Sequence, residues 1–226
     1  MEAVTLTNIS KRYGSVEALR GVSLSVSPGE LFGIIGPDGA GKTSLFRILT
    51  TLLLADGGSA SVCGLDVVKD YKAIRRRVGY MPGRFSLYPD LTVEESLNFF
   101  ATVFHTTIEE NYDLVRDIYR QIEPFRKRRA GKLSGGMKQK AALIRTLAFS
   151  PELLLLDEPA AGMNPTETEE LLEIIDYIRS EFKVSVLLIE HDMSLVMKIC
   201  ERIQVLDFGT TIASGTPAEI ANAPHV

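Results

Sequence analysis

The chain has 226 residues, of which 45% are hydrophobic and 24% are charged, and its formal net charge is -4 at pH 7. These proportions are those of an ordinary globular protein, and the length suits one domain with a sizeable core. The acidic balance argues against nucleic acid as a partner, because no long-range basic field is present to attract phosphate backbones.

The start of the chain, MEAVTLTNIS, has neither the basic nor the apolar region of a signal peptide. The most apolar stretch, LFRILTTLLLA, carries Arg47 and is far shorter than the ~20 residues that a membrane-spanning helix needs. If this protein serves a membrane, we expect it to do so through a partner. Cys63 and Cys200 lack the spacing of metal ligands and are expected to be free thiols in a reducing compartment.

The first quarter of the chain predicts three strands and a helix. Alternating apolar residues indicate short strands over 4–10 and 22–26, and a turn follows at 27–30. The apolar run 31–36 predicts a buried strand that leads into a glycine-rich loop. The spacing of apolar residues then predicts a helix from about Gly41 to Leu53.

The middle of the chain is mainly helical. Residues 59–64 and 78–81 read as strands, and a basic helix is expected near 70–77. From about 92 to 122 the apolar spacing is that of helices and no strand signal occurs. A further helix is expected to end at Phe149. This block predicts an inserted helical subdomain.

Strands and helices alternate again in the last third of the chain. Strands are predicted over 153–157, 184–190 and 202–207, and helices over 166–182 and 193–200. A final turn, strand and short helix complete the chain. Such alternation favours a largely parallel sheet that is covered on both faces.

A glycine-rich motif follows the strand at 31–36. The segment GPDGAGKT fits the pattern G-x-x-x-x-G-K-[ST], in which backbone N–H groups and a helix N-terminus surround phosphate oxygens. Lys42 is expected to reach the β- and γ-phosphates, and the hydroxyl of Thr43 to bind Mg²⁺. A plain glycine turn is the alternative. The residues expected to bind nucleotide here are Gly36, Pro37, Asp38, Gly39, Ala40, Gly41, Lys42, Thr43 and Ser44.

Two carboxylates follow the leucine run at 153–156. Asp157 and Glu158 stand at the carboxyl end of a strand, where open α/β sheets bind their ligands. Asp157 is expected to serve the metal, and Glu158 to polarise a water molecule for attack on the γ-phosphate. The alternative is a strand that ends in a polar cap.

The segment KLSGGMKQK, at 132–140, places a serine and two glycines at the start of a helix. Glycine within a helix costs about 1 kcal/mol relative to alanine, so the pair is locally unfavourable. Ser134 could cap the helix, or the backbone donors could be reserved for an anion.

In their order along the chain, the phosphate loop, LSGG, LLLLDEP and IEHD resemble the nucleotide-binding cassette of ABC transporters, and the resemblance covers the whole chain. It implies a P-loop NTPase fold with a mainly parallel sheet, an antiparallel β subdomain and an inserted α-helical subdomain. We expect a single domain over 1–226. Residues 1–82 and 151–226 would form its core, and about 83–150 its helical subdomain.

The resemblance also assigns roles to single residues. Tyr13 matches an aromatic residue that stacks on adenine, although local packing is the alternative. His191 matches a histidine that contacts the γ-phosphate and steadies the attacking water; the alternative is a structural histidine. The signature residues would bind ATP held by a facing cassette, so that one chain owns two half-sites. These residues are Leu133, Ser134, Gly135, Gly136 and Met137.

The function implied is that of an ATPase subunit at the cytoplasmic face of a membrane. Its cofactors would be ATP and Mg²⁺, its catalytic residues Lys42, Glu158 and His191, and its partners a second cassette in a homo- or heterodimer and a transmembrane permease. Two other functional classes are alternatives. A cassette of chromosome maintenance, DNA repair or translation would carry long coiled coils, a second cassette or basic linkers. Here only 92 positions separate Lys42 from Ser134 (134 − 42), and the chain is acidic with one cassette. A switch that binds ATP without hydrolysis and regulates a partner is opposed by Glu158 and favoured by Gly83.

Two positions depart from the family pattern. The loop before the helical block reads G-Y-M-P-G, so Gly83 stands where glutamine is expected, with Arg84 beside it. Water could replace the missing metal ligand, or Arg84 could take over part of the contact with the permease. Asn164 stands where aspartate is frequent, which puts communication across the dimer in doubt.

The two halves of the chain resemble different cassettes. Up to about Lys140 the motifs look like those of exporter-type cassettes, and beyond Ser150 they are similar to those of branched-chain amino acid importers. A divergent subfamily, a natural recombinant and an engineered hybrid would each give such a pattern, and we favour the last two.

Overall fold

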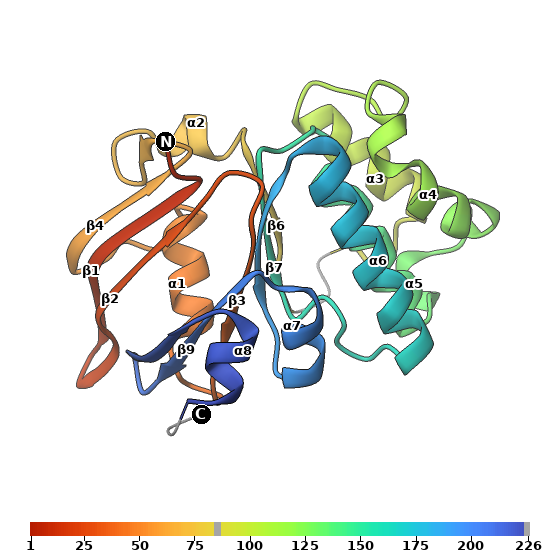
Figure 1. Ribbon diagram of the computed structural model, residues 1–226. Helices are drawn as coiled ribbons and strands as arrows, with labels where there is room; N and C mark the ends of the chain where they lie inside the picture. Colours follow the sequence, from red (N-terminus) through yellow and green to blue (C-terminus); the bar gives the residue numbers. More distant parts are fainter. Residues whose placement is uncertain (84–86, 224–226) are drawn as a thin grey trace.

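Two β-sheets and a layer of helices make up the fold in the computed structural model, which describes residues 1–83 and 87–223 (Figure 1). One sheet lies at the left of Figure 1, the helices α3 to α6 lie at the right, and the larger sheet stands between them. Arg84, for which contact with the permease was considered, lies outside the described residues.

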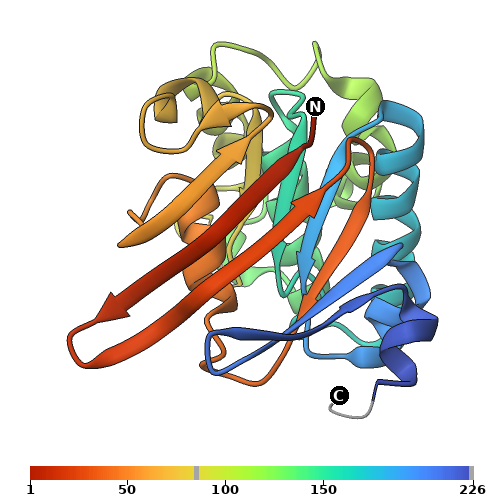
Figure 2. The same ribbon diagram turned by 60° about the vertical axis from the view of Figure 1, so that its left-hand side comes forward.

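Four strands form an antiparallel sheet in the order β2-β1-β4-β5. These strands are β1 (Val4–Tyr13), β2 (Val16–Val26), β4 (Gly57–Val62) and β5 (Leu65–Asp66). The predicted strand 22–26 begins earlier, because Val16 pairs with Tyr13 across a tight hairpin. Gly14 has φ 58 in this turn, a conformation that glycine adopts without steric cost. Figure 2 shows the hairpin in front of α1.

The larger sheet has six strands in the order β10-β9-β3-β8-β7-β6, and all are parallel except β10. These strands are β3 (Leu31–Ile35), β6 (Val78–Met81), β7 (Leu153–Asp157), β8 (Ser185–Ile189), β9 (Arg202–Asp207) and β10 (Thr210–Gly215). Every residue of β3, β7 and β8 is buried, as expected of parallel strands covered on both faces. The predicted parallel sheet is confirmed.

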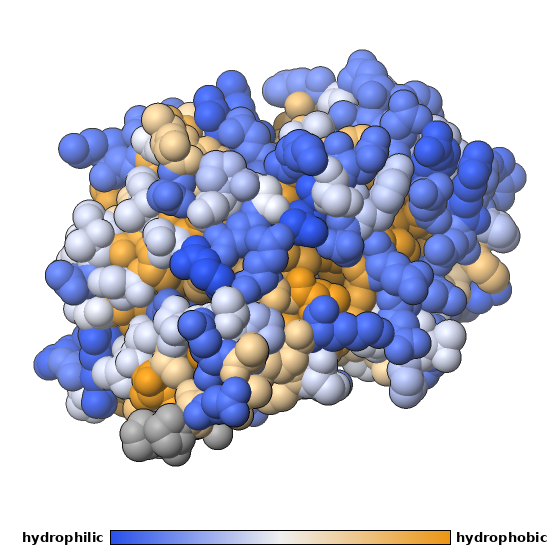
Figure 3. Space-filling view, in the orientation of Figure 1, coloured by the Kyte–Doolittle hydropathy of each residue, from blue (hydrophilic) through white to orange (hydrophobic). Residues whose placement is uncertain are grey.

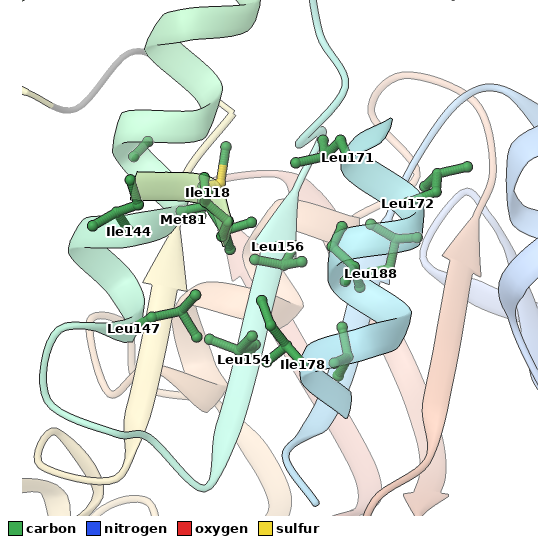
Figure 4. Packing of buried hydrophobic residues seen from close by; sticks show 14 of the residues in the cluster. Met81, Ile118, Ile144, Leu147, Leu154, Leu156, Leu171, Leu172, Ile178 and Leu188 are labelled. Carbon is green, nitrogen blue, oxygen red and sulfur yellow. The ribbon is translucent and has the colours of Figure 1, made fainter. Parts of the chain in front are cut away.

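The leucines of β7 point alternately to two separate cores. Leu153 and Leu155 pack with α1 and the antiparallel sheet. Leu154 and Leu156 pack with the helices on the opposite face, as Figure 4 shows. Because successive side chains of a strand point to opposite faces, four consecutive leucines satisfy both cores.

Eight α-helices lie in the described part of the chain. They are α1 (Lys42–Leu49), α2 (Tyr71–Ile74), α3 (Val93–Val103), α4 (Tyr112–Ile122), α5 (Gly135–Leu147), α6 (Pro165–Phe182), α7 (Met193–Ile199) and α8 (Pro217–Ala221). The 3₁₀ turns Glu123–Phe125 and Ala130–Lys132 join α4 to α5. Helices α3, α4 and α5 come between β6 and β7, so the predicted helical insertion is confirmed. Its domain boundary near 83–150 stays a prediction.

Helix α1 is shorter than the sequence predicts. It was expected to end near Leu53 and ends at Leu49. The hydroxyl of Thr50 donates a hydrogen bond to the carbonyl of Phe46 at 2.9 Å. Thr51 has φ 62, which turns the chain out of the helix. A threonine hydroxyl that bonds to the preceding turn therefore competes with continued helix.

Charged side chains cover the outer surface of the helical insertion. Figure 3 shows hydrophilic residues over most of this side of the molecule and an apolar area near its centre. On α4, Arg116 lies 3.4 Å from Asp113 and 3.6 Å from Asp117. Exposed pairs of this kind add little stability, so the fold depends on the two cores.

Replacing Leu154 by alanine tests whether the leucines of β7 are packed in the core. The side chain is fully buried, so the free energy of unfolding should fall by about 2–5 kcal/mol in urea denaturation. Leu54 is 64% exposed, and Leu54→Ala should change that free energy by less than about 0.5 kcal/mol. Equal effects of the two substitutions would contradict the packing of β7.

Candidate nucleotide-binding site

The phosphate loop joins β3 to α1, and its glycines are required by close contacts. A Cβ on Gly36 would lie 2.0 Å from the carbonyl oxygen of Leu206, and a Cβ on Gly41 would lie 2.3 Å from that of Ala18. Both glycines also have positive φ, 146° and 100°. Backbone of two other segments therefore encloses the loop, and only glycine fits at these positions.

Lys42 folds back over the loop that precedes it. Its Nζ donates hydrogen bonds to the carbonyl oxygens of Gly36 at 2.7 Å and Pro37 at 2.9 Å. Burial lowers the pKa of this amine, and the carboxylates of Asp38, Glu158 and Asp157 act in the opposite direction. The loop carbonyls thus hold the ammonium of Lys42 close to these three carboxylates.

Asp157 ends β7 beside the start of α1. Its Oδ2 accepts a hydrogen bond from the hydroxyl of Thr43 at 3.4 Å. Its Oδ1 is buried and has no hydrogen-bond partner. Burial raises the pKa of Asp157, and the neighbouring Glu158 raises it further, while the hydroxyl of Thr43 and the nearby backbone N–H of Gly83 lower it. An unpartnered buried carboxylate oxygen is costly unless a ligand satisfies it.

This oxygen set fits a magnesium ion that is bound together with a nucleotide. Mg²⁺ prefers carboxylate, hydroxyl and phosphate oxygens, and it commonly uses only one or two protein ligands. Within residues 1–83 and 87–223, no group of three or more histidine, cysteine, aspartate or glutamate side chains could hold a metal alone. Thr43 and Asp157 would therefore share such an ion with phosphates. A cation would also offset the effect of burial on Asp157.

Glu158 and His191 meet beside the phosphate loop. Nε2 of His191 lies 2.7 Å from Oε1 of Glu158 and 3.5 Å from Oδ1 of Asp38. Glu158 has φ 51, an uncommon value for glutamate, and its N–H donates to the carbonyl of Ile189 at 2.9 Å. With the loop residues Asp38 to Ser44, Glu158 and His191 line a cavity of about 220 Å³. Residues predicted from three separate motifs are thus brought together.

Glu190 is a site residue that sequence reasoning missed. It is 6% exposed, and its Oε1 accepts a hydrogen bond from the N–H of Ala160 at 2.9 Å. Its Oε2 accepts one from the N–H of His191 at 3.3 Å. Burial raises the pKa of this carboxyl. A glutamate at the end of an apolar strand was the available signal, and its contacts hold the segments of Glu158 and His191 together.

Tyr13 lies next to the phosphate loop as predicted, at the end of β1. Its hydroxyl is 3.3 Å from Oγ of Ser44 in α1. The side chain is 43% exposed, and Nζ of Lys11 lies 5.8 Å from the ring centroid. A partly exposed ring beside the loop is compatible with stacking on a base, which stays a prediction.

The signature residues do not line the cavity formed by the phosphate loop. Oγ of Ser134 accepts a hydrogen bond from the N–H of Met137 at 3.3 Å, so the helix-cap interpretation holds. Leu133 is 5% exposed and belongs to the core, against which Met137 also packs. Lys140 is buried and bonds to Gln121 and Glu170 at 2.6 and 2.8 Å. That lysine therefore joins α5 to α4 and α6, and its ammonium is occupied by groups of its own chain.

The two positions that depart from the family pattern have clear surroundings. A Cβ on Gly83 would lie 3.3 Å from the carbonyl oxygen of Asp157 and 3.7 Å from Oε2 of Glu158. A side chain here would therefore enter the site, as predicted for the expected glutamine. Asn164 caps α6, and its Oδ1 accepts a hydrogen bond from the N–H of Glu167 at 2.9 Å.

Comparison with known proteins shows to which family of proteins the chain belongs. The model of the ABC transporter family matches residues 19–161. The chain is 41% identical over 182 residues to the probable multidrug ABC transporter ATP-binding protein YbhF of Escherichia coli K12, and this match covers 79% of the chain and 32% of YbhF. It is 34% identical over 240 residues to the high-affinity branched-chain amino acid transport ATP-binding protein BraF of Pseudomonas aeruginosa, with 98% and 94% covered.

A solved structure agrees with the sequence comparisons. The dimeric post-hydrolysis state of the ATP-binding cassette MJ0796, bound to ADP and Pi, matches with a TM-score of 0.85 at 25% identity. This match covers 95% of the chain and 98% of that cassette. The chain therefore belongs to the ABC transporter family. It is one of its ATP-binding cassettes, a class of P-loop ATPase, and it spans 32% of the length of YbhF.

The comparisons give no support to a hybrid chain. A hybrid would be indicated by matches that end near 140–150. Instead, the match to BraF covers 98% of the chain, and a match over 79% of the chain, as for YbhF, must also run through 140–150. Similarity to both kinds of cassette along the chain explains the mixed motifs, because relatives share the core pattern of the fold.

No helix in the described part of the chain is long and apolar enough to cross a membrane.

Nucleotide binding by the loop can be measured as a gain in stability. A non-hydrolysable ATP analogue with Mg²⁺, at about 100 times its dissociation constant, should raise the free energy of unfolding by about 2.7 kcal/mol. Lys42→Ala should lose most of this gain, because Nζ is the cation at the centre of the loop. Lys69→Ala, at an exposed position, should keep it. A wild-type chain whose unfolding curve does not move with the analogue would contradict nucleotide binding.

Proposed function

We propose that this chain hydrolyses ATP and drives a separate transmembrane permease from the cytoplasmic face of a membrane, with ATP closing two cassettes head to tail. The observation that carries the proposal is the contact between Glu158 and His191 beside the phosphate loop. A cassette that only bound ATP would have no need of a carboxylate at this place.

The phosphate loop would act by binding and orientation. Backbone N–H groups of the loop and the start of α1 would surround the phosphates, with Lys42 turning from the carbonyls of Gly36 and Pro37 toward the β- and γ-phosphates. Thr43 and Asp157 would hold Mg²⁺, and this ion would neutralise part of the negative charge of the phosphates. Tyr13 would stack on the adenine.

The reaction would depend mainly on positioning and charge stabilisation. Glu158 would orient a water molecule and accept its proton as the water oxygen attacks the γ-phosphorus. The bond between that phosphorus and the β–γ bridging oxygen would break, so that ADP and phosphate leave. His191 would hold Glu158 and contact the γ-phosphate, and Glu190 would fix the backbone of His191. Lys42 would stabilise the charge that develops on the transferred group.

A second cassette would complete each site. The amino end of α5, with Ser134 and the two glycines that follow, does not line the cavity of its own phosphate loop. We propose that it binds the γ-phosphate of ATP held by the facing cassette, in a homo- or heterodimer. The dimeric structures of the cassette MJ0796 support this arrangement.

The permease would dock on the helical insertion and the loop at Gly83. Large apolar side chains are exposed there, with Tyr88 53%, Phe99 45% and Val103 54% exposed. The rings of Tyr88 and Phe99 meet edge to face, 5.6 Å apart. Exposed apolar clusters of this kind mark protein interaction sites. The structure of a cassette described as part of the transporter complex cbiONQ supports such a partner.

Replacing Glu158 by glutamine tests the ATPase proposal. Phosphate release should fall by at least about 100-fold, because glutamine cannot accept the proton of the attacking water. With Mg-ATP, the variant should elute as a dimer in size-exclusion chromatography. Glu152→Gln, at an exposed position just before β7, should keep wild-type phosphate release. Hydrolysis that survives in Glu158→Gln would exclude this residue as the base.

Restoring the expected glutamine at Gly83 tests the departure from the family pattern. Gly83→Gln should raise phosphate release by roughly fivefold, the effect of about 1 kcal/mol on the barrier, because its amide would lie near Glu158. Gly83→Ala adds the same Cβ without the amide and should not raise the rate. If both variants match the wild type, the glycine at this position is neutral.

A further inference from the structure

The amino end of α5 packs against the segment that follows Glu158. Nε2 of Gln139 donates a hydrogen bond to the carbonyl oxygen of Ala161 at 3.2 Å. A Cβ on Gly135 would lie 2.5 Å from the carbonyl oxygen of Gly162. The first turn of α5, which we call the signature helix, therefore touches the backbone of the segment that follows Glu158.

The second glycine meets a side chain and not backbone. A Cβ on Gly136 would lie 2.5 Å from Oε1 and 2.9 Å from Oε2 of Glu167. Gly136 is buried, so its side of the helix is covered by this carboxylate. Methyl hydrogens and a carboxylate oxygen cannot share that space, and one of them would have to move.

The Glu167 side chain cannot move without losing the hydrogen bond that its carboxylate accepts at the start of α6. Its Oε2 accepts from the N–H of Asn164 at 3.1 Å, and its own N–H donates to Oδ1 of Asn164 at 2.9 Å. These reciprocal bonds form a capping box at the start of α6. The carboxylate is thus held in one place, against the face of α5 that lacks a side chain.

A continuous set of contacts runs from the base to the signature helix. Glu158 begins the segment, and the N–H of Ala160 is fixed by Glu190. The segment ends at Asn164, which is bonded to Glu167, and Glu167 lies against Gly136. Under the proposed function, Glu158 serves the chain's own ATP, whereas the amino end of α5 serves ATP on the facing cassette.

We propose that Glu167 is a positioning residue, whose carboxylate sets the distance between the segment after Glu158 and the signature helix, and that Gly136 is glycine in order to admit it. This inference rests on the proposed function for its consequence, since the two elements belong to different ATP sites of a dimer. One side chain then couples the two half-sites of a single chain.

A double-mutant cycle distinguishes this inference from the alternative that Gly136 is glycine only because ATP on the facing cassette binds there. Gly136→Ala should lower kcat by about tenfold in the wild-type background, within the range of couplings between packed elements. In a Glu167→Ala background the same substitution should cost less than about twofold, because the carboxylate that meets the new Cβ is gone. If Gly136 were glycine only for the facing nucleotide, the loss would be the same in both backgrounds, and that result would overturn the inference.

The variants of Glu167 provide the readouts that a purely structural role would not give. Glu167→Ala should lower kcat and weaken ATP-dependent dimerisation in the Glu158→Gln background, while the affinity of the monomer for ATP stays unchanged. Glu167→Gln should restore both, because a glutamine carbonyl can still accept from Asn164. Glu169→Ala is the matched control on the exposed face of α6, where Glu169 contacts Lys198, and it should have no effect. Failure of Glu167→Gln to restore kcat would contradict positioning by the capping box.

A stability measurement keeps this test independent of ATP hydrolysis. If the wild-type chain released no phosphate, the proposed function would fail by itself. The same cycle can then be measured as urea midpoints, where Gly136→Ala should lower the midpoint with Glu167 present and not with alanine at 167. Additive midpoint shifts would overturn the assignment of Gly136 to this contact.

Discussion

Burial of β7 on both faces is the constraint on which the remaining structure depends. Its four leucines serve two cores in alternation, so no polar side chain can be placed along the strand. Chemistry is possible only where the strand leaves the cores, at Asp157 and Glu158. In the sheet order, β8 alone separates β7 from β3, which leads into the phosphate loop. The contact between Thr43 and Asp157 is the direct result of this order.

Several groups at this edge are held in arrangements that a ligand would satisfy. Oδ1 of Asp157 is buried without a partner, Glu158 has a left-handed backbone conformation, and Lys42 is bonded to carbonyls of its own loop. The unpartnered oxygen of Asp157 and the backbone conformation of Glu158 are unfavourable unless the surrounding structure enforces them. The two large cores provide that enforcement. A bound triphosphate with a cation would supply acceptors for Lys42 and a ligand for Asp157.

Local sequence was sufficient to predict the motifs, because each depends on neighbours along the chain. The phosphate loop requires glycines and a lysine at fixed spacing after a strand, and both were visible from 31–43. Contacts between distant segments were not visible. Glu190 bonds to Ala160, thirty residues away, and Lys140 bonds to Glu170. The early start of β2 also depended on pairing across a hairpin, which the weak alternation of 16–21 did not indicate.

The glycines of the signature helix show how one residue type can meet two requirements. A glycine pair at the start of a helix is unfavourable by propensity, and exposure to a partner's phosphate is one reason to keep it. In the described structure, Gly135 and Gly136 already face Gly162 and Glu167 of the same chain at distances that leave no room for a Cβ. The opposite side of the helix start, with Ser134 exposed, remains accessible to a ligand. Because the two requirements act on different sides of one turn, a substitution can disturb one without the other. Under the proposed function, a helix held in this way would transmit a displacement of the segment after Glu158 to the surface that would meet the facing nucleotide.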